Sequence, residues 1–347
     1  MLKYNIENPS KTIENKIIKK INQKTKPPGS LGKLEEIAHQ VSLIQQTTEP
    51  TINNPAILVF SSDHGIAKEG VSPFPQEVTK QMVLNFAGEG AAINVFAKQH
   101  GLAVSIIDAG VIGEFPEEYK SKILNYKMAE GTQNFLEEPA MTKIQCEEAI
   151  KKGAEITHQC YEKGCNLIGF GEMGIANTSS SALLMHFLTG EPLDICVGKG
   201  TGLDDKGVLK KKQILAKAAA NYTGKDDGFS VLQQFGGFEH AMMVGGFLKA
   251  AENKMTVMVD GFNVTAAFLT AYQIQPEIKD YCLFAHMSDE KGHRKMLEYL
   301  KAKPLLQLGM RLGEGTGAAV AFPLVQSAVN FLNQMTSFED AGVSKSD

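Results

Sequence analysis

The sequence of 347 residues predicts an α/β fold with a doubly wound, mostly parallel sheet. Short apolar stretches recur along the chain and alternate with longer segments of helical periodicity, which is the arrangement of βαβ units. Each stretch is hydrophobic almost throughout, as expected for strands that helices cover on both faces. Helical segments at both chain ends have no strand of their own, which predicts a second, smaller helical domain.

Five strands are expected, and they cover residues 56–63 (AILVFSSD), 102–110 (LAVSIIDAG), 166–172 (NLIGFGE), 255–261 (MTVMVDG) and 281–286 (YCLFAH). Helices of three or more turns are expected between most of them. Several of these strands end in an acid or a glycine, as at Asp63, Asp108 and Glu172. Ligands of open parallel sheets bind outside the carboxyl ends of the strands, so the sequence predicts a site at that edge.

The N-terminal helix is predicted from Ile13, Ile17 and Ile21, which recur at intervals of four residues. It is expected to end before Pro27, because the residue before a proline avoids the helical region. A second helix is expected over about 34–44. With the helix that follows Glu314, these segments predict a small domain of residues 1–50 and 305–347 beside an α/β domain of residues 51–304.

The composition is that of an ordinary globular enzyme, with 43% hydrophobic and 21% charged residues. A net charge of −4 gives no reason to expect nucleic acid or an anionic membrane as a partner. Apolar runs are far shorter than the roughly 20 residues that span a bilayer, and the N-terminus lacks a signal-peptide core. Five cysteines without a CxxC pair indicate neither a disulfide framework nor a zinc site. We therefore expect a cytoplasmic enzyme.

The segment GFGEMGIANTSSSALL (169–184) has two interpretations. Its G-x-G-x-x-G string follows a strand and precedes a helix, which is typical of dinucleotide binding, but Glu172 inside the string would oppose a pyrophosphate. Alternatively, Asn177, Thr178 and Ser179 begin a helix whose amides and hydroxyls could hold one phosphate. The same residue types are common N-caps, so phosphate binding and ordinary capping both remain open.

Three further motifs contain residues that could form a site. GKGTGLDD (198–205), followed by Lys211, lacks the Walker A pattern and is either part of a phosphate pocket or a surface loop. Asp63 and His64 lie at a strand end, but metal-ligand spacings such as HExxH are missing, so no metal is expected. RLGEGTGAA (311–319) places Glu314 among glycines, either as an exposed acid in a turn or as a carboxylate held close to a small, flat substrate.

Eight segments occur in order from Lys26 almost to the C-terminus: KPPGSLGKLEEIA, SSDHGIAKEGVSPFPQEVT, GFGEMGIANTSSSALL, GKGTGLDD, FGGFEHAMMVGG, VMVDGFNVTAA, AHMSDEKGHRKMLEYL and RLGEGTGAAVAFPL. Together they resemble the nicotinate-nucleotide–dimethylbenzimidazole phosphoribosyltransferase family. The resemblance implies transfer of a 5-phosphoribosyl group from nicotinate mononucleotide to 5,6-dimethylbenzimidazole during cobalamin synthesis. It also implies a Rossmann-like sheet with a small helical domain, a homodimer with sites near the subunit interface, and no cofactor.

The resemblance further implies which residues form the site. Glu314 corresponds to the family's catalytic carboxylate and Glu172 to its second site carboxylate. The 72–82 loop, which includes Met82, and Leu312 correspond to the pocket for the benzimidazole. This loop varies within the family, with glutamine in some members where Met82 stands here, so the preferred base is left open. Phosphate and ribose contacts would fall on Gly174, Asn177, Thr178, Ser179, Gly200, Lys211, Gly261 and Ser288, although Lys210 and Lys212 compete with Lys211.

Two other functions are alternatives. A nicotinamide-dinucleotide-dependent oxidoreductase would use Gly169, Gly171 and Gly174 to bind its cofactor. A non-catalytic nucleotide-binding module is the third interpretation, and it would leave Glu314 unexplained.

Overall fold

The computed structural model describes residues 4–200 and 202–344, in which a six-stranded parallel sheet forms the centre. The strands lie in the order β3-β2-β1-β4-β5-β6, which reverses between β1 and β4 as in doubly wound nucleotide-binding folds. Their bounds are β1 (Ala56–Ser62), β2 (Ala103–Gly110), β3 (Ile123–Asn125), β4 (Leu167–Met173), β5 (Thr256–Val259) and β6 (Cys282–Phe284). The predicted fold class and all five predicted strands are confirmed, while the short edge strand β3 was missed.

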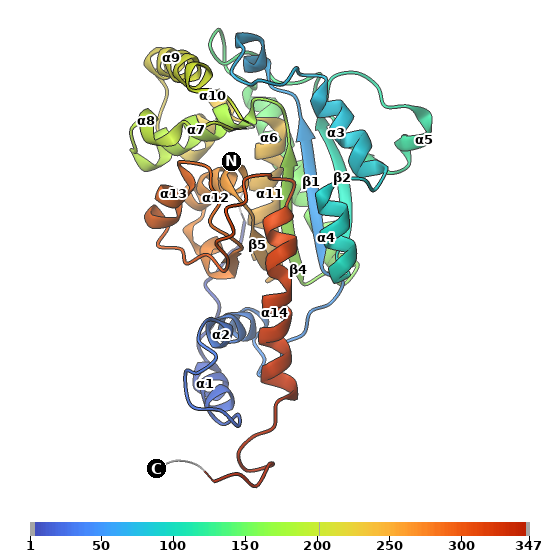
Figure 1. Ribbon diagram of the computed structural model, residues 1–347, viewed down its shortest axis with the longest axis vertical. Helices are drawn as coiled ribbons and strands as arrows, with labels where there is room; N and C mark the ends of the chain where they lie inside the picture. The colour runs from blue at the N-terminus through green and yellow to red at the C-terminus, as the bar shows by residue number, and fades with distance from the viewer. Residues whose placement is uncertain (1–3, 201, 345–347) are drawn as a thin grey trace.

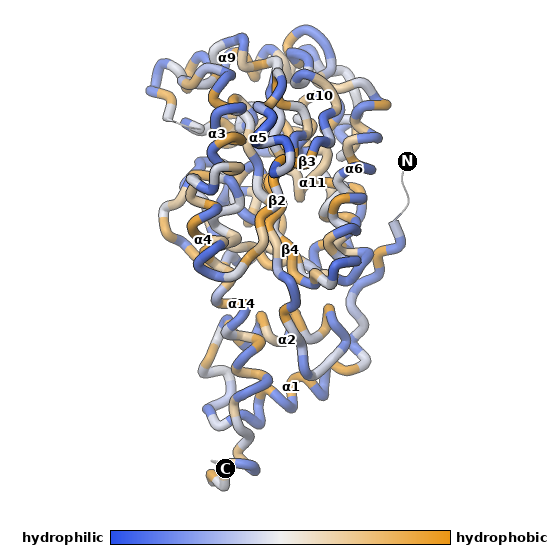
Figure 2. Tube along the Cα trace, turned by 90° about the vertical axis from the view of Figure 1, so that its right-hand side faces the viewer, coloured by the Kyte–Doolittle hydropathy of each residue, from blue (hydrophilic) through white to orange (hydrophobic). Residues whose placement is uncertain are grey.

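Helices cover both faces of the sheet, as the apolar strands require (Figure 1). Every residue of β1 is buried, and its side chains alternate between two cores. Leu58 and Phe60 pack with helices on one face: α6 (Lys143–Glu162), α7 (Asn177–Thr189), α10 (Gly228–Phe235), α11 (Phe238–Glu252) and α12 (Phe262–Ile274). Ile57 and Val59 pack with helices on the other: α1 (Glu14–Asn22), α2 (Lys33–Gln45), α3 (Val78–Ala87), α4 (Ala92–His100) and α14 (Thr316–Gln334). Figure 2 shows the hydrophobic segments of β2 and β4 inside these layers.

The remaining helical elements lie in the connections between these strands and helices. They are α5 (Glu117–Lys120), α8 (Leu193–Cys196), α9 (Asp205–Asn221), α13 (His293–Tyr299) and the 3₁₀ helices Gly65–Glu69 and Pro276–Tyr281. None of the described helices is long and apolar enough to cross a membrane. The five cysteines are free thiols.

The N-terminal helices α1 and α2 lie below the sheet, beside the distal half of the C-terminal helix α14 (Figure 1). Lys24 Nζ donates to the Met335 carbonyl at 2.6 Å, which ties the segment after α1 to the end of α14. Ile17 of α1 nevertheless belongs to the same core as Ile57 of the sheet, and Leu305 N donates to the Phe284 carbonyl at the end of β6. The division into residues 1–50 plus 305–347 and 51–304 therefore stays a prediction.

Candidate active site

A cavity of about 390 Å³ opens at the carboxyl edge of the sheet, and we call it the edge cavity. Its walls come from segments that follow β1, β4, β5 and β6 and from the turn before α14. Ten residues predicted from the sequence line it: Met82, Glu172, Gly174, Asn177, Thr178, Gly200, Gly261, Ser288, Leu312 and Glu314. The fold thus brings together residues up to 232 positions apart (82 to 314), as the rule for parallel sheets predicts.

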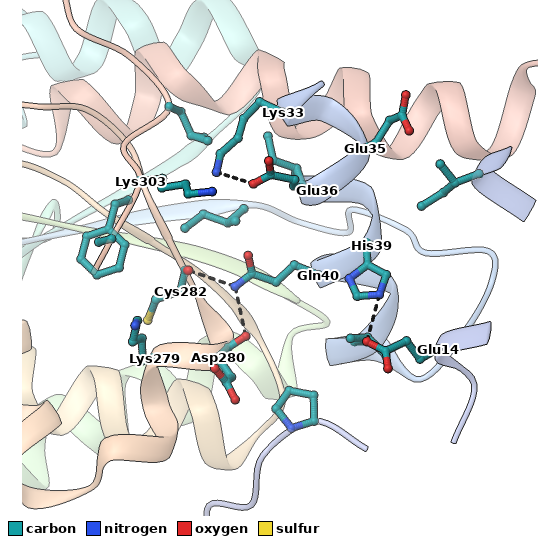
Figure 3. A pocket seen from close by; sticks show the side chains of 18 of the residues that line it. Glu14, Lys33, Glu35, Glu36, His39, Gln40, Lys279, Asp280, Cys282 and Lys303 are labelled. Carbon is teal, nitrogen blue, oxygen red and sulfur yellow. Dashed lines mark hydrogen bonds and ion pairs between the residues drawn. The ribbon is translucent and has the colours of Figure 1, made fainter. Parts of the chain in front are cut away.

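A larger cavity of about 770 Å³ lies between α1, α2 and the segments around β6 (Figure 3). None of the site residues predicted from the sequence is among the described residues that line it. Its polar groups pair with each other, as where Lys33 Nζ lies 2.9 Å from Glu36 Oε2 and Gln40 donates to the Cys282 carbonyl. The hydrogen bond from Lys33 lowers the pKa of Glu36, so this carboxylate is a poor base at neutral pH. The predicted site residues therefore indicate that the edge cavity, and not the larger one, is the active site.

Glu314 lies in the turn that leads into α14. Gly313, Glu314 and Gly315 all have positive φ, at 89°, 64° and 83°, so the backbone holds a non-glycine residue in an uncommon conformation that aims its side chain. The residue is only 5% exposed, and Oε2 accepts a long hydrogen bond of 3.4 Å from the Ile93 N–H in the first turn of α4. Burial raises the pKa of Glu314 to about 7, despite this hydrogen bond. A carboxylate with that pKa is suited to accept a proton near neutral pH.

Glu172, at the end of β4, is the second carboxylate of the edge cavity. Burial raises its pKa to about 7, and the charges of Glu239 and Asp260 act in the same direction. Asn177 Nδ2 donates to Glu172 Oε2, and Asn263 Nδ2 donates in turn to Asn177 Oδ1 at 3.1 Å. The amides fix the orientation of the carboxylate, so one cavity holds two buried acids that titrate near neutrality.

Two glycines allow the segments that carry these acids to touch. A Cβ at Gly313 would overlap Glu172 Oε1, and a Cβ at Gly171 would overlap the backbone carbonyl of Glu314. The β4 strand and the turn before α14 are therefore in backbone contact. This close approach explains why the residues around Glu314 lack side chains.

The start of α7, next to Glu172, forms a further part of the edge-cavity wall. Its N-cap is Ala176, at φ 77°, whose side chain makes no capping hydrogen bond. The capping interpretation of Asn177, Thr178 and Ser179 is therefore wrong, because these residues lie inside the first turn. Ser179 is fully buried behind the cavity wall, and its Oγ has no hydrogen-bond partner among the described residues.

Lys211 is the one buried lysine of the 210–212 run, at 1% exposure. Its Nζ donates to Thr178 Oγ1 at 2.7 Å, which places the ammonium behind Thr178 and outside the cavity lining. Burial lowers the pKa of Lys211 to about 8, although the Glu290 charge opposes the shift. Gly200 lies beside the same pair, since a Cβ there would be 2.9 Å from Thr178 Oγ1 and 3.6 Å from Lys211 Nζ.

Several residues of the edge cavity were not named individually from the sequence, among them Phe74 of the predicted 72–82 loop, Asn263, His286, Glu290 and Arg311. Glu290 Oε1 accepts from Gly200 N at 3.0 Å, and Arg311 donates to the Gly200 carbonyl at 3.3 Å, so both hold the 198–203 loop. All five lie within motifs that were quoted for the resemblance. Their position inside those motifs was the sequence signal that could have identified them as site residues.

The dinucleotide interpretation fails on the position of its glycines. Gly169 and Gly171 lie within β4, whereas a dinucleotide fingerprint needs them in the turn after the strand. A Cβ at Gly169 would be 2.5 Å from Ile57 Cδ1, so this glycine serves packing between β4 and its neighbours. Only Gly174 lies beyond the strand, and nothing supports the oxidoreductase alternative.

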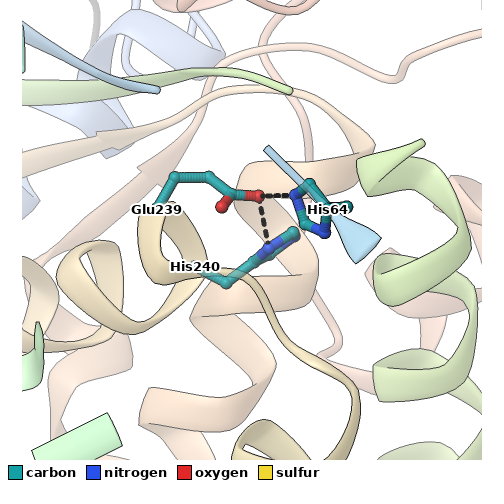
Figure 4. Close-up of side chains that lie close together, drawn as sticks. All are labelled: His64, Glu239 and His240. Carbon is teal, nitrogen blue, oxygen red and sulfur yellow. Dashed lines mark hydrogen bonds and ion pairs between the residues drawn. The ribbon is translucent and has the colours of Figure 1, made fainter. Parts of the chain in front are cut away.

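A buried cluster of His64, Glu239 and His240 lies behind the turn at Gly174 (Figure 4). Glu239 Oε1 is 2.7 Å from His64 Nε2 and 2.8 Å from His240 Nδ1. Burial alone would lower the pKa of His64, but the charge and hydrogen bond of Glu239 raise it. Burial alone would raise the pKa of Glu239, but the charges and hydrogen bonds of the two imidazoles lower it. The three residue types could ligate a metal, but these separations are hydrogen-bond lengths and fit protons shared between the groups.

Comparisons with known proteins agree with this geometry. A family model described as phosphoribosyltransferase matches residues 6–343. A protein of Dechloromonas aromatica (strain RCB), named nicotinate-nucleotide–dimethylbenzimidazole phosphoribosyltransferase, is 54% identical and covers 99% of both chains. One of the same name from Aromatoleum aromaticum is 52% identical over 93% of this chain and 94% of its own. The crystal structure of CobT from Thermus thermophilus has a TM-score of 0.92 at 40% identity, covering 96% of this chain and 99% of that one. The chain belongs to the nicotinate-nucleotide–dimethylbenzimidazole phosphoribosyltransferase family.

Proposed function

We propose that the protein transfers the 5-phosphoribosyl group of nicotinate mononucleotide to 5,6-dimethylbenzimidazole. The products are α-ribazole 5′-phosphate and nicotinate, with inversion at C1′, and the reaction serves cobalamin biosynthesis. The names of the relatives support the substrate pair. The single observation that carries the proposal is the pair of buried carboxylates, Glu314 and Glu172, in one cavity with pKa values raised to about 7.

Glu314 is the proposed general base. One ring nitrogen of the benzimidazole attacks C1′ while the bond from C1′ to the pyridine nitrogen breaks. The pyridine nitrogen leaves with the bonding electron pair and needs no proton. The N–H proton of the attacking base passes to the Glu314 carboxylate, which burial has made basic enough to accept it. Attack opposite the leaving group converts the β-linkage into α.

Glu172 is the proposed second carboxylate of the site, held by Asn177 against the turn of Glu314. Next to Asn177, we propose that the start of α7 with Thr178, Lys211 and Gly200 supplies amides, a hydroxyl and a positive charge for the 5′-phosphate. Gly174, Gly261 and Ser288 are proposed to complete the contacts to phosphate and ribose, and Ser179 is proposed to support them from behind the cavity wall. Holding both reactants in line in this way contributes several kcal/mol, about 7–11 in well-oriented cases.

The benzimidazole is proposed to bind against the apolar wall of the edge cavity, at Met82, Leu312 and Phe74. Leu312 and Phe74 remain 58% and 47% exposed at that wall. We further propose that a second copy of the chain covers the mouth of the edge cavity. Light scattering of the purified protein would test this as a dimeric mass.

The free thiols fit a reducing compartment, so we propose that the reaction takes place in the cytoplasm.

The proposal is tested by measuring nicotinate release from nicotinate mononucleotide in the presence of dimethylbenzimidazole, unsubstituted benzimidazole or a purine. We expect release only when a base is present, with the α-anomer as the nucleotide product by NMR. Glu314→Gln serves as the inactive control. Release at the same rate without an acceptor base, or a β-linked product, would contradict the mechanism.

A further inference from the structure

His293 begins α13 and follows a segment that contributes two residues, Ser288 and Glu290, to the edge cavity. The histidine side chain is fully buried, and both of its ring nitrogens have a partner. Nδ1 accepts from the Ser288 N–H at 2.8 Å, and Nε2 lies 2.9 Å from Thr265 Oγ1 on α12. The ring therefore joins the segment at the cavity to a helix that covers the sheet.

The partners of the His293 ring fix where its proton lies. A backbone N–H can only donate, so Nδ1 must carry a lone pair while it is bound to Ser288. The single ring proton is then on Nε2 and points to the Thr265 hydroxyl oxygen, which can accept it. Burial lowers the pKa of His293 to about 3, and the charge of His286 acts in the same direction, so the ring is neutral near pH 7.

The segment before His293 is closed by further hydrogen bonds. The Glu290 N–H donates to Ser288 Oγ at 3.3 Å, and the His293 N–H donates to the Glu290 carbonyl at 3.0 Å. The Asp289 N–H donates to the Met310 carbonyl at 2.9 Å. Residues 288–293 thus form one hydrogen-bonded turn that closes on the imidazole.

This turn determines where part of the cavity wall lies. Glu290 Oε1 accepts from the Gly200 N–H at 3.0 Å, and a Cβ at Gly198 would overlap the Glu290 carboxylate, so the glycine loop is folded around this side chain. Without an acceptor on residue 293, the buried Ser288 N–H would be unpaired, which is costly enough to favour a shift of the turn. Such a shift would move Ser288, Glu290 and the loop together.

We propose that His293 is a positioning residue for the nucleotide part of the site, because its Nδ1 atom accepts the Ser288 N–H and so holds Ser288 and Glu290 in the cavity wall. The imidazole acts through these two residues and does not itself contact the substrate. The inference rests on the proposed function, in which Ser288 and Gly200 contribute to binding of the phosphate and ribose.

Two amide variants separate this role from simple packing. In His293→Asn the side-chain oxygen can take the place of Nδ1 and accept from Ser288. In His293→Gln the amide reaches the place of Nε2 instead, and Ser288 is left without an acceptor. Glutamine is closer to histidine in volume, so packing alone would favour the glutamine variant.

Initial rates with nicotinate mononucleotide and dimethylbenzimidazole measure the difference. We expect His293→Gln to raise the KM for the nucleotide about 10–100-fold with a smaller change in kcat, and His293→Asn to stay within about threefold of the wild type. The KM for dimethylbenzimidazole should change little in both variants. His158→Gln, at a half-exposed position on α6, is the control and should leave both KM values unchanged.

The tautomer is tested without substrate, by ¹⁵N NMR of the imidazoles in the folded wild-type protein. We expect the His293 ring to stay neutral, with its proton on Nε2, from about pH 8 to about pH 5, because its pKa is lowered to about 3. A proton on Nδ1, or protonation of this ring near the ordinary histidine pKa of about 6.5, would overturn the proposal.

The proposal is also overturned if His293→Gln binds the nucleotide at least as well as His293→Asn. If thermal unfolding shows that the amide variants do not fold, the NMR result on the wild type decides. Failure of the proposed function looks different: the wild type would release no nicotinate although His293 shows the expected tautomer.

Discussion

Glu172 Oε1 occupies the space where a β-carbon of residue 313 would lie, so the turn that carries one acid makes room for the other. Gly313 also has a φ of 89°, a conformation that other L-residues rarely adopt. The glycine therefore serves two separate purposes. Its conformation aims Glu314, and its missing side chain admits Glu172.

Gly313→Ala should separate these purposes when it is compared with Gly309→Ala. Gly309 has a similar φ of 67°, but a Cβ there meets nothing within 4 Å. Both variants should lose stability by about 1 kcal/mol from backbone strain. Only Gly313→Ala should lower kcat/KM, by about tenfold or more, because it displaces a site carboxylate. Urea unfolding and initial rates measure both effects, and equal activity losses would show that the contact with Glu172 is irrelevant.

Glu314→Gln should lower kcat by about 10²–10⁴, the range for removal of a general base, and leave the KM for nicotinate mononucleotide nearly unchanged. Because the base must be ionised and its pKa is raised to about 7 in the free protein, wild-type kcat/KM should rise with pH through about 7. Glu172→Gln is the control: its rate should be lower but should still rise with pH. A rising limb that survives in Glu314→Gln and vanishes in Glu172→Gln would assign the base to Glu172.

Glu172→Gln should also stabilise the protein at alkaline pH. The pKa of Glu172 is about 7 in the folded state against 4.5 in the reference state, so the native protein binds the proton more tightly than the unfolded chain. Stability therefore falls as the pH rises from about 4.5 to 7, and the charged form remains unfavourable above that range. The glutamine variant should gain on the order of 1–3 kcal/mol at pH 8 and much less at pH 5.

Urea unfolding at both pH values measures this gain. Glu148→Gln, at a half-exposed position on α6, is the control and should gain nothing at pH 8. A destabilised Glu172→Gln at pH 8 would mean that the hydrogen bond from Asn177 outweighs the penalty of burying the charge.

The sheet could be predicted because its strands are buried on both faces and read as continuous apolar runs. β3 could not, since it is three residues long and Leu124 and Asn125 are exposed. The position of the site at the carboxyl edge of the sheet could be predicted from the acids and glycines at the strand ends. In contrast, the partners of these residues depend on contacts over long separations, such as His64 with Glu239, 175 positions apart. Local sequence does not encode such pairs. The same limit explains why the start of α7 was open to a capping interpretation until Ala176 proved to be the N-cap.

Lys211→Met should weaken binding of the nucleotide through its phosphate. Hydrogen bonds to charged groups contribute about 1.5–3 kcal/mol, so the KM for nicotinate mononucleotide should rise about 10–100-fold while kcat changes less. Lys212→Met is the matched control, because Lys212 pairs with the exposed Asp194 and such surface pairs contribute little.

Because the pKa of Lys211 is lowered to about 8, the wild-type KM should also rise as the pH passes 8 and the ammonium loses its proton. Lys211 Nζ donates to Thr178 Oγ1 in this structure, so a purely structural role would give the same loss with nicotinate riboside, which has no phosphate. A loss confined to the phosphorylated substrate assigns the lysine to the phosphate, and an equal loss on both substrates refutes that assignment.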